Sequence, residues 1–320
     1  MRLLFTVLAV VVISIVIASP GVAATDPPVD VPASAVAKTL VCQPGVAPRH
    51  AEPVLLLGGP WSAHELWTWG WQRSLRRAGH PSCYLDLPQH GIGDMQISAR
   101  QVVLAIRAVH ARAHGPIAIY GVGWGGLLAR LALTGWPEER RVVSDVVSVS
   151  AIQHGSQAAG VVSCQNNCPV AMWQRRAGSQ LLTALDRSPD ETPNPTAWTT
   201  VRSSDDIIET PADGPRPTSA LSGATNLLLQ NICPARRYRD SLGLAFDSLA
   251  FAALGDALNH PGPARRARMK RACARQYAPG LTQATVTDRV SRATNASTQR
   301  ILAAPRVDAE PPVLSPFDGT

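Results

Sequence analysis

The sequence predicts an α/β protein with a mostly parallel sheet that is covered by helices on both faces. Two observations lead to this prediction. Short apolar runs alternate with longer segments in which apolar residues recur at helical spacing, and this alternation is typical of parallel strands joined by helices. In addition, one apolar run ends in a cluster of glycines from which a helical pattern starts. The hydrophobic content of 45% is enough to build a core.

The alternation can be followed along the chain from residue 53. Strands are predicted over 53–59, 82–88, 116–121 and 145–150, and the helices between them over 64–79, 94–114 and 124–134. Gly79 stands where the first of these helices ends, a common position for glycine. Two further apolar runs, over 197–203 and 225–230, predict additional strands of the same sheet.

Residues 1–41 do not follow this pattern. A positively charged start, an apolar run and the small residues Val22-Ala23-Ala24 predict a signal peptide over 1–24. Residues 25–41 are rich in proline and alanine and are interpreted as a leader. We therefore expect a protein that is secreted or resides in the cell envelope.

The remainder of the chain is expected to form one domain over 42–285. Within it, residues 160–195 lack strand periodicity and contain several prolines, which predicts an inserted cap. From residue 286 to residue 320 the chain is polar, with proline-rich stretches near its end, and we expect a poorly packed C-terminal tail there.

The charge of the chain suggests one kind of partner and argues against another. The formal net charge is +7, mostly from arginine. An anionic membrane or wall surface would be attracted by such a chain, but a solvated arginine-rich surface is the simpler interpretation. The stretch ARRARMKRACAR, residues 264–275, predicts a basic helical face. No nucleic-acid-binding motif accompanies the charge, so nucleic acid is not expected as a partner. The oligomeric state is left open.

Six cysteines in an exported chain predict three disulfides, for which spacing alone leaves 15 pairings open. Cys164 and Cys168 lie close enough in sequence for a metal site, but no second Cys or His pair follows at suitable spacing. No metal site and no cofactor are predicted.

The glycine cluster has the layout of a nucleophile elbow. Residues 117–133 read IAIYGVGWGGLLARLAL, and the motif G-x-S-x-G places the nucleophile at its centre. Gly123 stands at that position, and this stretch contains neither serine nor cysteine. Glycine reaches a positive φ without the steric penalty that other residues suffer. The chain therefore keeps the elbow without its nucleophile.

Several motifs occur in the order found in one family. They are VCQPG, PVLLLGG, AGHPSCYLDLP, GVGWGG, CPVAMWQRRAGSQLLTAL, SSDDIIETP and NICPARRYRDSLGLAF. Together, over roughly residues 40–275, they resemble the lipase B-type family (class 2 lipases) of α/β-hydrolases, including its secreted bacterial members. The resemblance implies the α/β-hydrolase fold, an ancestor that hydrolysed carboxylic esters, and the disulfides Cys42–Cys83, Cys164–Cys168 and Cys233–Cys273.

The resemblance also assigns the positions of a catalytic site. Acyl transfer requires a nucleophile, a base, an acid that orients the base, and donors for the oxyanion. The nucleophile position is Gly123 and the base position is Ser241, so neither function is retained. The acid position is Asp205, with Asp206 beside it. Of the two oxyanion positions, Trp124 keeps a backbone N–H, whereas Pro60 has none.

Three functions are compatible with these residues. The leading hypothesis is a secreted pseudoenzyme of lipase ancestry that binds an acyl or lipid ligand, or a partner, without turnover. A second is an active lipase or esterase with displaced catalytic residues, such as Ser163 or Ser179 with His154 or His90. A third is an envelope interaction protein whose basic surface matters more than its pocket. Outside the second hypothesis, His154 is interpreted as structural.

Overall fold

The computed structural model describes residues 26–47, 51–61, 66–158 and 166–318. The predicted signal peptide, Ser163 and Cys164 lie outside these ranges, so the expectations that concern them stay predictions. None of the helices in these ranges is long and apolar enough to cross a membrane.

The strands of the described chain form one sheet in the order β1-β3-β2-β4-β5-β6-β7. They are β1 (Leu40–Cys42), β2 (Val54–Leu57), β3 (Ser82–Leu85), β4 (Ile117–Val122), β5 (Val143–Val149), β6 (Ala197–Arg202) and β7 (Thr225–Leu228). Only the edge strand β1 is antiparallel to its neighbour, and all other neighbours in the sheet run parallel.

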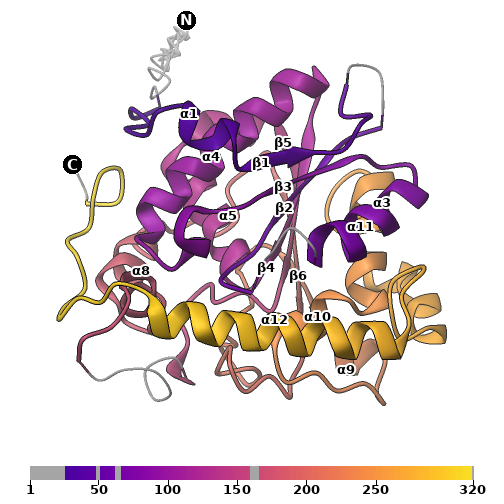
Figure 1. Ribbon diagram of the computed structural model, residues 1–320. Helices are drawn as coiled ribbons and strands as arrows, with labels where there is room; N and C mark the ends of the chain where they lie inside the picture. The colour runs from indigo at the N-terminus through magenta and orange to yellow at the C-terminus, as the bar shows by residue number, and fades with distance from the viewer. Residues whose placement is uncertain (1–25, 48–50, 62–65, 159–165, 319–320) are drawn as a thin grey trace, which may run out of the picture.

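Helices cover both faces of this sheet (Figure 1). One face packs against α1 (Ser34–Ala37), α4 (Met95–Ala113), α5 (Trp124–Gly135), α7 (Val170–Gln174) and α8 (Gln180–Leu185). The other packs against η1 (Trp67–Gln72), α3 (Arg73–Arg77), α9 (Leu229–Ile232), α10 (Ser241–Ala245) and α11 (Ser248–Asn259). Short turns η2 (Pro88–Gly91), η3 (Pro137–Arg141), η4 (Arg266–Arg268) and η5 (Lys270–Ala274) connect these elements.

The apolar runs of the strands contribute side chains to the cores on both faces of the sheet. In β2, Leu55 and Leu57 belong to the core on one face, and Val54 and Leu56 belong to the core on the other. Successive side chains of a strand point to opposite faces, so a strand covered on both faces needs a continuous apolar run. The predicted α/β fold with its mostly parallel sheet is confirmed.

Two expectations about the N-terminal and basic segments were wrong. Leu40 and Val41, assigned to the leader and not to the domain, belong to β1, which pairs with β3. The stretch 264–275 does not form a helical face, but the two short 3₁₀ turns η4 and η5. Met269 is buried there and Arg268 forms an ion pair with Asp256, so these contacts shape the segment rather than helical periodicity.

The expectation of a poorly packed tail was also wrong. Residues 283–303 form the long helix α12 (Gln283–Ala303), drawn in yellow across the molecule in Figure 1. Thr282 caps the helix and Val286 is buried against the core. Beyond the helix, Arg100 Nη2 donates to the carbonyl oxygen of Ser315 at 2.8 Å, and Phe317 is buried. A few spaced apolar contacts thus hold a segment that is polar on average.

Two of the disulfides that the resemblance implies are present, Cys42–Cys83 and Cys233–Cys273. The first joins β1 to β3, and the second joins the end of α9 to η5. We expect peptide mapping without reduction to recover both cross-links, together with a third peptide in which Cys164 is bonded to Cys168. Free thiols, or other partners, would contradict the pairing.

Candidate functional site

The predicted elbow is present between β4 and α5. Gly123 has φ 54° and ψ −114°, a region that side chains other than glycine's enter only with strain. The two glycines that follow allow the turn to close tightly: a Cβ at Gly125 would lie 2.2 Å from the carbonyl oxygen of Leu57, and one at Gly126 would lie 2.5 Å from the Cβ of Ala151. The backbone of the elbow is intact although its nucleophile position carries no side chain.

The structure brings Gly123 and Ser241 face to face. A Cβ at Gly123 would lie 2.9 Å from the Oγ of Ser241 and 3.5 Å from its Cβ. Ser241 is the first residue of α10, where Asp240 caps the helix by accepting from the N–H of Gly243 at 2.7 Å. With the Cβ atoms of positions 123 and 241 only 3.5 Å apart, a serine at the first and an imidazole at the second would have no room beside each other. The space that a serine–histidine pair requires is closed.

The acid position of the predicted site falls on a pair of aspartates with different surroundings. The side chain of Asp205 is 40% exposed and forms an ion pair with Arg237 at 3.1 Å. Asp206 is buried, and its Oδ1 accepts from the backbone N–H groups of Ile208 and Glu209 at 2.9 Å. Burial, together with nearby Asp240, raises the pKa of Asp206 to about 6, against the backbone hydrogen bonds that lower it. The acid position predicted at Asp205 thus has a buried carboxyl group directly beside it.

The two positions predicted to bind an oxyanion, Pro60 and Trp124, lie beside the elbow in the cavity lining. Pro60 follows β2 without an N–H, and its carbonyl oxygen accepts from Arg300 Nη1 of α12 at 2.6 Å. The Trp124 side chain is buried against the loop after β2, where a Cβ at Gly59 would lie 3.0 Å from the indole Cγ. A bulky ring therefore covers the loop that would hold an oxyanion.

A cavity of about 410 Å³ remains beside the elbow. Its walls come from the loop after β2, the start of α5, the α7 region, the loop after β6, the start of α10, and α12 with the residues that follow it. The lining residues include Trp61, Trp124, Met172, Arg175, Ile208, Glu209, Asp240, Ser241, Leu242, Thr298, Ile301, Leu302 and Arg306. The cavity is mostly apolar, and the side chain of Trp124 narrows it without filling it.

Two buried ionisable side chains in this lining are not indicated by the sequence. Arg175, at the end of α7, is 6% exposed, and Glu209, in the loop after β6, is 2% exposed. Burial raises the pKa of Glu209 to about 8, although Arg175 lowers it. Burial lowers the pKa of Arg175, an effect that Glu209 opposes. An arginine within the cap motif was visible in the sequence, but the carboxyl group beside it comes from a distant loop.

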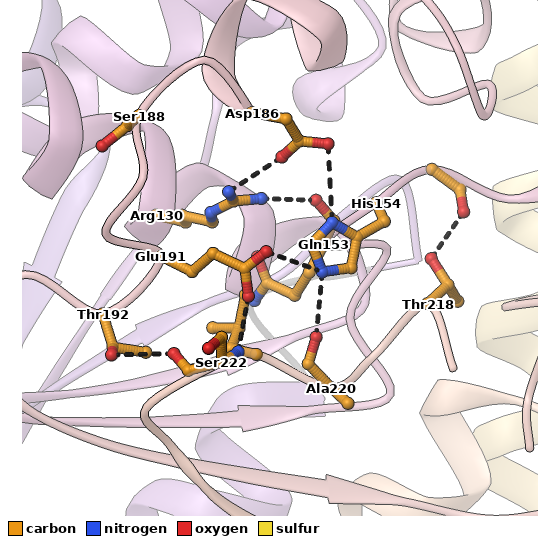
Figure 2. Close-up of polar contacts among 12 residues, drawn as sticks. Arg130, Gln153, His154, Asp186, Ser188, Glu191, Thr192, Thr218, Ala220 and Ser222 are labelled. Carbon is orange, nitrogen blue, oxygen red and sulfur yellow. Dashed lines mark hydrogen bonds and ion pairs between the residues drawn. The ribbon is translucent and has the colours of Figure 1, made fainter. Parts of the chain in front are cut away.

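His154 lies in a polar cluster away from the cavity lining (Figure 2). Its Nδ1 is 3.5 Å from Asp186 Oδ2, and its Nε2 is 3.5 Å from Glu191 Oε1 and 3.1 Å from the carbonyl oxygen of Ala220. One ligand atom of each of these three side chains lies within 4.8 Å of the others. Buried Arg130 already binds Asp186 at 2.8 Å, so a cation here would compete with a guanidinium. The contacts fit the structural role predicted for His154.

The displaced catalytic residues are not assembled in the described chain. The Oγ of Ser179 donates to the carbonyl oxygen of Gln174 and accepts from the N–H of Leu182, as a helix cap. The Nδ1 atom of His90 lies 3.9 Å from Asp86 Oδ1. No hydrogen bond within the described ranges joins Ser179 to His154 or His90.

Comparison with known proteins finds lipases that are similar to this chain. No model of a known protein family matches the chain. Lipase B of Pseudozyma antarctica is 25% identical over 212 residues, which is 65% of this chain. The match spans 62% of the length of that curated relative, less than two thirds of it.

Solved structures give a closer correspondence in three dimensions. Aspergillus fumigatus lipase B superimposes with a TM-score of 0.83 at 25% identity, covering 92% of this chain and 74% of its own. A Bacillus licheniformis lipase in propeptide form reaches a TM-score of 0.53 at 16% identity, covering 71% and 54%, and shows the fold alone. By sequence and by fold, this chain is a homologue of the lipase B-type α/β-hydrolases.

Proposed function

We propose that this protein is a non-catalytic descendant of a lipase, which binds an apolar acyl compound in the old active-site cavity without hydrolysing it. The observation that carries the proposal is the facing pair Gly123 and Ser241, at the positions of nucleophile and base, beside a cavity of about 410 Å³. A glycine cannot attack a carbonyl, and a serine hydroxyl is a poor base. The disulfides and the lipase homologues favour an extracellular site of action.

The remaining polar groups do not supply a substitute. Trp124 covers the loop in front of Pro60, and a missing oxyanion donor costs about 10²–10³ in rate. Ser241 has no histidine within hydrogen-bond distance among the described residues. Its neighbour Asp240 uses its carboxylate to cap α10. The site can thus hold a ligand but has no group placed to activate a nucleophile.

The unmodified protein is expected to leave p-nitrophenyl esters of short and long acids unhydrolysed above the rate of an unrelated protein. It is also expected to remain unlabelled by a fluorophosphonate that reacts with activated serines. A fluorescent long-chain acyl probe should nevertheless bind with one site per chain. The comparison of these three measurements separates a binding protein from an enzyme and from a protein whose cavity is unused.

The double variant Gly123→Ser, Ser241→His provides the matched test of the site. Because the Cβ positions are only 3.5 Å apart, the new pair lacks the room to form a hydrogen bond, and activity should stay near background. Labelling of the unmodified protein, with turnover that the Ser179→Ala variant removes, would instead support the displaced-residue hypothesis and overturn this proposal.

A further inference from the structure

Arg175 is a buried cation for which the described residues supply no ion pair. It is 6% exposed, it lines the cavity, and its Nε has no hydrogen-bond partner. No carboxylate of the described residues lies within ion-pair distance of it. Its guanidinium carbon lies 5.0 Å from the centre of the Trp124 ring, an arrangement that is favourable but supplies no hydrogen-bond acceptor to Nε.

Arg130 is another buried arginine, and its guanidinium has both an ionic partner and a hydrogen-bond acceptor. Arg130 is 1% exposed, and its guanidinium donates to Asp186 Oδ1 and to the carbonyl oxygen of Gln153, both at 2.8 Å. A buried charge is costly unless it is paired and hydrogen-bonded. Among the described residues Arg175 has no such partner, and its place in the cavity lining favours a ligand as the partner.

The neighbouring acids do not fill this role. Glu209 is 2% exposed and its Oε2 also lacks a hydrogen-bond partner. Because burial raises its pKa to about 8, Glu209 is mostly neutral near pH 7 and offers an O–H donor beside Arg175. Asp240 is engaged in capping α10, and Asp206 accepts from two backbone N–H groups.

The rest of the cavity is suited to a hydrocarbon chain. Trp61, Met172, Ile208, Leu242, Ile301 and Leu302 line it. Apolar walls with a small number of placed polar groups are typical of sites for small amphiphiles, in which the polar groups set orientation.

We propose that the cavity binds a free fatty acid, with its carboxylate on the Arg175 guanidinium and the Glu209 O–H, and its alkyl chain along the apolar walls. This inference rests on the proposed function and makes it more specific, since it selects the free acid over the neutral ester that a lipase would hydrolyse.

The test measures the affinities of decanoate, methyl decanoate and decylamine by displacement of a fluorescent acyl probe at pH 7. Decanoate should bind at least about tenfold more tightly than methyl decanoate, as expected for a charge-assisted hydrogen bond. Arg175→Met, which keeps the length of the side chain but not its charge, should remove that preference while leaving the affinity for the methyl ester unchanged. Arg76→Met is the control, because Arg76 is exposed on α3 and does not line the cavity.

Each result has a separate meaning. Equal affinities for the acid and its methyl ester in the unmodified protein would overturn this inference and leave acyl binding in place. Tighter binding of decylamine would also overturn it, since the acidic groups would then dominate. Binding of none of the three compounds would reject the proposed function itself. These comparisons hold in the unmodified protein even if the Arg175→Met variant does not fold.

Discussion

Gly125→Ala is expected to destabilise the protein by more than about 3 kcal/mol, beyond the usual cost of overpacking a core. The added Cβ would lie 2.2 Å from the carbonyl oxygen of Leu57 and 2.7 Å from the backbone nitrogen of Gly58. Both are main-chain atoms at the end of β2, so no side chain can rotate away to make room. Urea unfolding followed by circular dichroism measures the change.

Gly255→Ala is the matched control for this substitution. Gly255 lies inside α11, and a Cβ there would meet no atom within 4 Å. Alanine favours a helix over glycine by about 1 kcal/mol, so this variant should be as stable as the unmodified protein or more so. If Gly125→Ala unfolded at the same urea concentration as Gly255→Ala, the close contact between the elbow and β2 would be wrong.

The free energy of unfolding is expected to fall by a few kcal/mol as the pH rises from about 5 to about 8, and Glu209→Gln should reduce this fall. Burial raises the pKa of Glu209 from 4.5 in the unfolded chain to about 8 in the folded protein. Between these values the folded state holds a proton that the unfolded state has lost, so stability decreases with rising pH. Asp145, with a pKa raised by burial to about 7, adds in the same direction.

Urea unfolding of the two proteins at pH 5.5, 7 and 8.5 measures this effect. The advantage of the variant over the unmodified protein should be smallest at pH 5.5, just above the pKa of Glu209 in the unfolded chain, and should grow to its full size at pH 8.5. Exposed Glu138 provides the control substitution Glu138→Gln, which should leave the slope unchanged. If the free energy of unfolding fell equally steeply with pH in Glu209→Gln and in the unmodified protein, Glu209 would be ionised in the folded state.

The parts of the fold that follow from local pattern were predictable from the sequence. β2 and β4 are runs of apolar residues because both faces of the sheet are covered. β1 was missed since three residues carry no usable periodicity. α12 was missed because its polar composition resembles that of a disordered segment, and its stability comes from contacts with distant residues.

The candidate site divides in the same way. Motifs located Gly123 and Ser241, and the structure brings these two positions together. A motif cannot show the different surroundings of two adjacent aspartates: Asp205 pairs with Arg237 at the surface, whereas Asp206 is buried. Arg175 and Glu209 are separated by more than thirty residues, and their proximity depends on the packing of the cap segment against the loop after β6.

The position of α12 has a consequence for the order in which the molecule is made. Thr298, Ile301, Leu302 and Arg306 supply one wall of the cavity, yet they are synthesised after the sheet and every other wall. During synthesis, a chain that has reached only residue 281 contains the residues of the elbow and of the other cavity walls. The side of the cavity that α12 covers is still open at that point. The pocket is therefore completed after the sheet can form, and a ligand can be enclosed only once this last helix has docked.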